Sequence, residues 1–207
     1  NSEVQYWTSL GFTVAEVNYG GSSGFGREYR ERLNYKWGIL DSYDCKALVM
    51  NLIKLSLVDS SKVAILGNSA GGLTAINSLC EDELFKVAIC KYPVLDLNDM
   101  HHHTHRFEKG YLNSLIGEYS QFFNEYQLRS PINKIAELKK PILLFHGKED
   151  YVISYKQTLK IKEILLKNNK LSEVIFFDNE GHGFKNINNK KRVLFKSQKF
   201  LEKTLNI

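Results

Sequence analysis

The sequence predicts an α/β fold in which a mostly parallel sheet is flanked by helices. Short apolar runs predict five strands, at 12–19, 63–66, 87–90, 142–145 and 174–177. Segments with apolar residues at helical spacing lie between these runs. The runs are almost continuously apolar, which indicates strands covered by helices on both faces, as in parallel sheets.

Helices are predicted at 2–9, 27–36 and about 41–55, and Asp41 is a candidate cap for the third. The alternation of strands and helices is interrupted at 96–130, where a histidine-rich loop is followed by further helices. It resumes afterwards, and the final helix carries leucines on one face. No internal repeat or linker divides the 207 residues, so a single domain is expected.

The composition is that of an ordinary globular protein, with 43% hydrophobic and 25% charged residues. No apolar run approaches the ~20 residues of a membrane-spanning helix. The net charge of +5 comes from scattered lysines without interleaved aromatics, so neither a membrane nor a nucleic acid is an expected partner. Cys45, Cys80 and Cys90 lack the spacing of a metal or Cys-x-x-Cys site, which predicts free thiols in a reducing, cytoplasmic compartment.

A glycine-rich turn around Ser69 separates the apolar run 63–66 from a helical segment. The turn, Gly67 to Gly72, contains the pattern Gly-x-Ser-x-Gly. Such a turn holds a serine hydroxyl outward on a strained backbone, and its small neighbours let strand and helix approach. The N–H groups at the start of the helix point to the same place and suit a developing negative charge. An ordinary Gly/Ser turn is the alternative, which the flanking strand and helix disfavour.

Two further polar residues follow predicted strands. Asp150 comes shortly after the strand at 142–145, and His182 lies in a glycine loop after the strand at 174–177. The carboxyl ends of parallel strands meet at one edge of a sheet, where α/β proteins keep their chemistry. A serine needs an imidazole to take its proton, and the imidazole needs a carboxylate to orient it. Ser69, Asp150 and His182 therefore predict a catalytic triad, in the chain order of α/β-hydrolases.

Several longer stretches match one family. They are 18–27, Trp37-Gly38 with Asp41 and Asp44, 67–72, 146–150 and 181–184. Together they span nearly the whole chain, so they are far more specific than the serine turn alone. In these stretches the chain resembles the catalytic domain of the prolyl oligopeptidase family of serine peptidases, which have the α/β-hydrolase fold and include dipeptidyl peptidases and acylaminoacyl peptidases.

The resemblance implies a role for each residue of the triad. Ser69 would be the nucleophile, His182 the general base and then acid, and Asp150 the carboxylate that orients the imidazole. The backbone N–H of Ala70 would be one oxyanion-hole donor. The expected activity is hydrolysis of short peptides through an acyl-enzyme, with no cofactor.

The resemblance also implies an aromatic-lined pocket for the residue before the cleaved bond. Phe107 and Tyr111, four residues apart on a predicted helix, would form its walls, and Ile153 would add another. Ordinary core packing is the alternative for these side chains.

The start of the chain departs from the family pattern. In the α/β-hydrolase fold, a loop between the third strand and the first helix supplies the second oxyanion donor. Residues 2–9 resemble that first helix, so residues 1–207 are expected to be the C-terminal part of a longer protein. The first three strands, the oxyanion loop and the family's β-propeller would precede them, and the edges left by the missing strands would be unpaired.

Two motifs favour structural roles. The glycine loop 20–26 has neither the glycine spacing nor the Lys-Ser/Thr of a phosphate cradle. His101, His102, His103 and His105 are adjacent residues, whereas catalytic zinc draws its ligands from separated positions with supporting partners. No functional metal is expected.

Two other functions stay open. The same triad serves carboxylesterases and thioesterases, because it attacks any activated acyl group. A third hypothesis is a catalytically incompetent fragment or an interaction module. Its basis is the missing oxyanion loop, because the loss of one oxyanion donor typically lowers the rate 10²–10³-fold.

Overall fold

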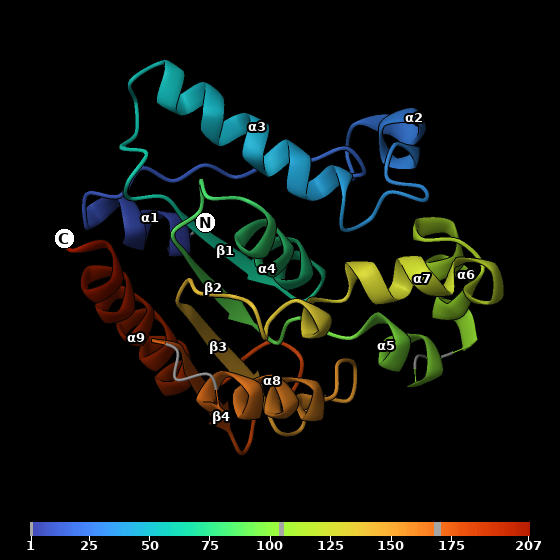
Figure 1. Ribbon diagram of the computed structural model, residues 1–207. Coiled ribbons are helices and arrows are strands. Elements are labelled where there is room, and N and C mark those ends of the chain that lie inside the picture. Colours follow the sequence, from blue (N-terminus) through green and yellow to red (C-terminus); the bar gives the residue numbers. More distant parts are fainter. Residues whose placement is uncertain (1, 104–105, 168–170) are drawn as a thin grey trace.

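A computed structural model describes residues 2–103, 106–167 and 171–207. Its centre is a sheet of four parallel strands in the order β1-β2-β3-β4 (Figure 1). The strands are β1 (Ala64–Asn68), β2 (Val87–Lys91), β3 (Ile142–Gly147) and β4 (Glu173–Phe177). The prediction of a parallel sheet is confirmed, and four of the five predicted strands are present.

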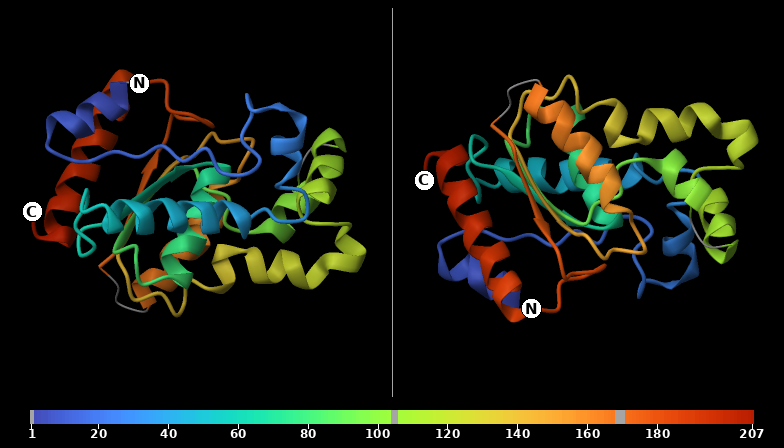
Figure 2. Two further views of the ribbon diagram at one scale, coloured as in Figure 1. Left: turned by 90° about the horizontal axis from the view of Figure 1, so that it is seen from above. Right: turned by 90° about the horizontal axis from the view of Figure 1, so that it is seen from below.

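Helices cover both faces of this sheet (Figures 1 and 2). α1 (Ser2–Ser9) and α9 (Ile187–Leu205) lie on one face, and α4 (Ala70–Glu81) and α8 (Tyr155–Lys167) lie on the other. α3 (Leu40–Lys54) packs on α4. The remaining helices are α2 (Gly26–Glu31), α5 (Leu97–His103), α6 (Arg106–Leu115), α7 (Tyr119–Arg129) and the short 3₁₀ helix η1 (Pro131–Asn133). None of the described helices combines the length and apolar character that crossing a membrane requires.

The strand β2 shows why the apolar runs are continuous. Val87 and Ile89 join the core under α1 and α9, whereas Ala88 and Cys90 join the core under α4 and α8. All four are at most 3% exposed. Since successive side chains point to opposite faces, a strand buried on both sides needs an apolar residue at every position.

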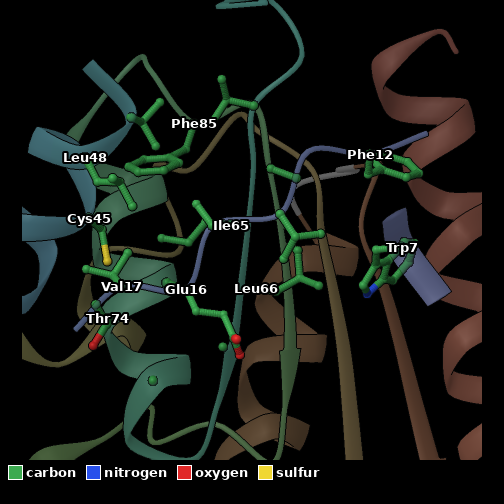
Figure 3. A pocket seen from close by; sticks show the side chains of 18 of the residues that line it. Trp7, Phe12, Glu16, Val17, Cys45, Leu48, Ile65, Leu66, Thr74 and Phe85 are labelled. Atoms are coloured by element: carbon green, nitrogen blue, oxygen red, sulfur yellow. The ribbon is translucent and has the colours of Figure 1, made fainter. Parts of the chain in front are cut away.

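The predicted strand at 12–19 is wrong. This segment has no regular secondary structure and belongs to no described strand ladder. A groove of about 690 Å³ lies between residues 12–17 and β1, and Figure 3 shows Val17, Leu48 and Leu66 among the side chains on its walls. Leu66 is 43% exposed although it belongs to the sheet. The residues have the composition of a strand, but strand formation also needs a neighbour with which to exchange hydrogen bonds.

Three smaller expectations also differ from the structure. Asp41 does not cap α3 but lies buried in its first turn, where it accepts a hydrogen bond of 2.7 Å from the N–H of Gly38. The second helix, α2, is shorter than the predicted 27–36. The histidines at 101–103 do not form a loop but end α5.

Candidate active site

Ser69 lies in the turn between β1 and α4, on a strained backbone. Its φ of 52° and ψ of −119° are rare for residues other than glycine. A Cβ atom on Gly67 would lie 2.0 Å from the backbone oxygen of Gly71, and one on Gly72 would lie 2.4 Å from the Cβ of Pro93. The two glycines therefore allow β1, α4 and the segment after β2 to meet at this turn.

Backbone hydrogen bonds hold the turn against neighbouring segments. The N–H of Ser69 donates to the carbonyl of Lys91 over 3.0 Å, and its carbonyl accepts from Gly72 and Val94. Ala70 is the first residue of α4, so its N–H has no acceptor inside the helix. This N–H, together with the helix dipole, suits an oxyanion that forms beside Ser69.

Side chains from the loops after β3 and β4 form a hydrogen-bonded chain that ends at Ser69. The Nε2 atom of His182 lies 3.0 Å from the Oγ atom of Ser69. The Nδ1 atom of His182 lies 2.9 Å from the Oδ2 atom of Asp150. The fold thus joins residues that are 113 and 32 positions apart in the sequence into one hydrogen-bonded chain. All three follow the carboxyl ends of parallel strands.

The chain of hydrogen bonds assigns the proton on each atom. Nδ1 of His182 faces a carboxylate oxygen, so it carries the imidazole proton, and Nε2 accepts from the Ser69 hydroxyl. Burial alone would raise the pKa of Asp150, but hydrogen bonds from His146 and His182 outweigh burial and hold its pKa well below the usual range. The carboxylate is therefore ionised at neutral pH. Its side chain is fully buried, whereas that of His182 is 23% exposed.

The loop that carries His182 is anchored by Glu180, which is 2% exposed. Its carboxylate accepts from the N–H groups of Lys185 and Asn186 and from the side-chain amide of Asn189, at 2.8 to 3.0 Å. Its carbonyl accepts from the N–H of Glu149 over 3.0 Å. The loops bearing His182 and Asp150 are therefore tied together by backbone as well as by the imidazole.

Comparison with known proteins identifies the family. The profile described as the Prolyl oligopeptidase family matches residues 1–207. The chain belongs to the prolyl oligopeptidase family.

The relatives and solved structures compared with this chain are longer than it is, and the chain matches only part of each. The crystal structure of a puromycin hydrolase matches with a TM-score of 0.95 and 36% identity, over 99% of this chain and 31% of that one. The structure of a puromycin-hydrolyzing peptidase of Mycobacterium tuberculosis matches with a TM-score of 0.94 and 35% identity, over 99% of this chain and 32% of that one. Acylamino-acid-releasing enzyme 2 of Oryza sativa subsp. japonica is 29% identical over 86% of this chain and 24% of its own length. The chain thus spans about a quarter to a third of these proteins.

Of the three residues predicted to line a substrate pocket, the two whose side chains the structure describes differ in their exposure. Tyr111 lies on α6 and is 62% exposed. Ile153 is only 2% exposed and packs in an apolar cluster with Trp37 and Leu73. Phe107 also belongs to α6, but its side chain lies outside the described residues. The pocket assignment stays a prediction for all three residues.

The histidine run contributes no metal cluster among the residues that the structure describes. The ring of His101 stacks on Tyr119, with centroids 4.1 Å apart and planes at 6°. His103 is paired with Asp99 over 3.3 Å, His102 is exposed, and His105 lies outside the described residues. The stacked rings of His101 and Tyr119 join α5 to α7, whereas the pair of His103 and Asp99 lies within α5.

Sequence reasoning missed two side chains that contact His182 or Asp150. The ring of Tyr92, just after β2, lies 4.7 Å from that of His182. His146, near the end of β3, lies 3.2 Å from Asp150. His146 was part of the motif 146–150, but a single histidine in a buried strand gave no sign of its partner.

Proposed function

We propose that this chain carries a serine peptidase site that hydrolyses short peptides through an acyl-enzyme and needs no cofactor. The observation that supports this most is the continuous line of hydrogen bonds from Ser69 through His182 to Asp150. The chain's family membership gives the same indication. We assign Ser69 as the nucleophile, His182 as base and then acid, and Asp150 as the group that orients the imidazole.

The first half of the reaction forms the acyl-enzyme. As Oγ of Ser69 attacks the scissile carbonyl, its proton passes to Nε2 of His182, and Asp150 stabilises the imidazolium that results. The N–H of Ala70 donates to the oxyanion. His182 then protonates the leaving amine, which departs as the carbon–nitrogen bond breaks.

The second half releases the product. Water attacks the ester on Ser69 and gives its proton to His182, which returns it to Oγ as the ester bond breaks. The free acid and the original enzyme result, so atoms and charge balance without a metal or a cofactor.

The names of relatives support a proposal for the substrate class. They describe release of acylated amino acids, a dipeptidyl aminopeptidase and hydrolysis of puromycin. We propose short peptide-like amides as the substrates of this chain. The free cysteines Cys45, Cys80 and Cys90 support a cytoplasmic location.

A fluorophosphonate probe tests this function directly, because it reacts only with an activated serine. We expect the longer polypeptide proposed below to be labelled and its Ser69→Ala variant not to be. Turnover of an aminoacyl-anilide should fall about 10⁶-fold in the same variant, because the triad works as a unit. Equal turnover in the two proteins would contradict the proposal.

An esterase is the second candidate. One oxyanion donor, the backbone N–H of Ala70, is assigned in this site. This favours an activated ester, because an ester demands less stabilisation of the oxyanion than an amide does. Rates on a p-nitrophenyl ester and on an aminoacyl-anilide separate the two. Ester cleavage without measurable anilide cleavage would favour the esterase.

We also propose that residues 1–207 are the C-terminal part of a longer polypeptide, which adds strands and a β-propeller. Two observations support this: the chain spans 24–32% of the relatives compared, and the groove beside β1 is flanked by a segment without regular secondary structure (Figure 3). The second oxyanion donor would come from a loop upstream of α1. If so, residues 1–207 alone would be catalytically weak or incompetent.

A further inference from the structure

A second histidine contacts the carboxylate of the triad. His146 lies in β3 with none of its side chain exposed. Its Nε2 atom lies 3.2 Å from Oδ2 of Asp150, the same oxygen that accepts from His182. The same Nε2 atom lies 2.9 Å from the carbonyl of Ile153, and Nδ1 lies 2.7 Å from the hydroxyl of Thr158 on α8.

The partners of His146 define its protons. Nε2 faces two acceptors, the carboxylate and a carbonyl, so it carries a proton. In the neutral ring Nδ1 then accepts from the hydroxyl of Thr158. A buried ring with both nitrogens bonded cannot rotate without losing these partners.

The carboxylate of Asp150 is held on both oxygens. Its Oδ1 accepts from the N–H groups of Val152 and Ile153, each at 2.9 Å. Its Oδ2 is shared between the two histidines. The four donors to the carboxylate are the N–H groups of Val152 and Ile153 and the two histidine rings. Three of them are fixed by the backbone or by the buried ring of His146, so the position of Oδ2 does not depend on His182.

We propose that His146 is a positioning residue for the reaction, which holds Oδ2 of Asp150 in place and shares its negative charge with His182. This inference rests on the proposed serine hydrolase function. The described contacts of His146 are to Asp150, Ile153 and Thr158, so it reaches His182 and Ser69 through Asp150.

Sharing the carboxylate has a consequence for the pH dependence. Without the Nε2–H of His146 3.2 Å from Oδ2, the full negative charge of that oxygen would face His182 and would favour the imidazolium over the neutral ring. Other titratable groups lie on the elements around this cluster. They are Tyr92 beside the His182 ring, the ion pair of Lys91 with Glu3, the ion pair of Lys148 with Asp178, and Glu180. The variants below leave all of these unchanged.

Three variants of the full-length polypeptide test the proposal. His146→Gln places an amide donor near the position of Nε2, whereas His146→Leu removes the donor. His146→Leu combined with Thr158→Val also removes the hydroxyl that the leucine would leave without a partner. The measurement is the second-order rate of labelling by a fluorophosphonate probe between pH 5 and 9, on protein whose folding is verified by its thermal transition.

We expect both leucine variants to be labelled about 10- to 100-fold more slowly at low pH, as for the loss of one hydrogen bond to a charged group. The midpoint of their pH profile should move to higher pH, and glutamine should restore both quantities. If the folded His146→Leu variant has the same pH profile of labelling rate as the wild type, the proposal is overturned. So would a uniform loss of rate with an unchanged midpoint, because that indicates only a structural role.

Labelling also separates this inference from the substrate assignment. A wild-type protein that is labelled but cleaves no peptide would contradict the peptidase and leave the comparison of variants intact. If the wild type and the His146 variants are all labelled and cleave peptides, and their pH profiles of labelling coincide, only the role of His146 is contradicted.

Discussion

At the scale of residues, the turn around Ser69 depends on the absence of side chains at two positions. Gly67 and Gly72 are in contact with backbone or proline atoms, where a methyl group has no room. Gly71 lies between them, and a Cβ there would meet nothing within 4 Å. The three glycines look alike in the sequence, yet only two are required by packing.

Gly67→Ala should therefore destabilise the protein and abolish labelling of Ser69. A methyl group 2.0 Å from a backbone oxygen forces β1 and α4 apart, at a cost of about 1–3 kcal/mol in the free energy of unfolding. Gly71→Ala is the matched control and should unfold at the wild-type temperature or slightly above it, because alanine favours the helix. Thermal unfolding by circular dichroism measures both. Equal transitions for the two variants would refute this account of the turn.

At the scale of elements, the loop between β4 and α9 is organised by a buried carboxylate. Burial alone would raise the pKa of Glu180. Hydrogen bonds from Lys185, Asn189 and Asn186 outweigh burial and lower its pKa. A glutamate that ionises more easily in the folded state contributes stability above its unfolded pKa of about 4.3, and this contribution is lost as the pH falls further.

Glu180→Gln should lower the free energy of unfolding by about 1–3 kcal/mol at pH 7, because one amide replaces a charged acceptor of three hydrogen bonds. At pH 3 the difference from the wild type should shrink, since that pH lies below the unfolded pKa and the wild-type carboxylate is then largely protonated in the unfolded state. Urea unfolding at the two pH values measures this. A difference that is constant with pH would show that charge on Glu180 is unimportant.

At the scale of the whole molecule, the groove beside β1 is the feature that the chain does not fill. Leu66 points an exposed apolar side chain into it from the sheet (Figure 3). An edge strand with apolar neighbours is a site for pairing with another strand. The proposed upstream strands would cover this place.

Leu66→Lys distinguishes a covered groove from an open one. In residues 1–207 alone the substitution should leave thermal stability nearly unchanged, because the side chain is already 43% exposed. In the proposed longer polypeptide it should cost at least about 2 kcal/mol, because a charge would be buried without a partner. Leu57→Lys, at a position 59% exposed, is the control and should be neutral in both. Equal tolerance of Leu66→Lys in both proteins would contradict the upstream strand.

The sequence alone determined the parallel sheet, the helices on both of its faces and the grouping of Ser69, Asp150 and His182 at one edge. Apolar periodicity and position after a strand are local properties, so a single chain displays them. Other features depended on neighbours distant in the sequence. Residues 12–19 have the composition of a strand but lack a ladder partner, and the buried His146 is recognised only by what it contacts. Tertiary structure decided these points because hydrogen bonds and burial are relations between segments, which composition and spacing do not contain.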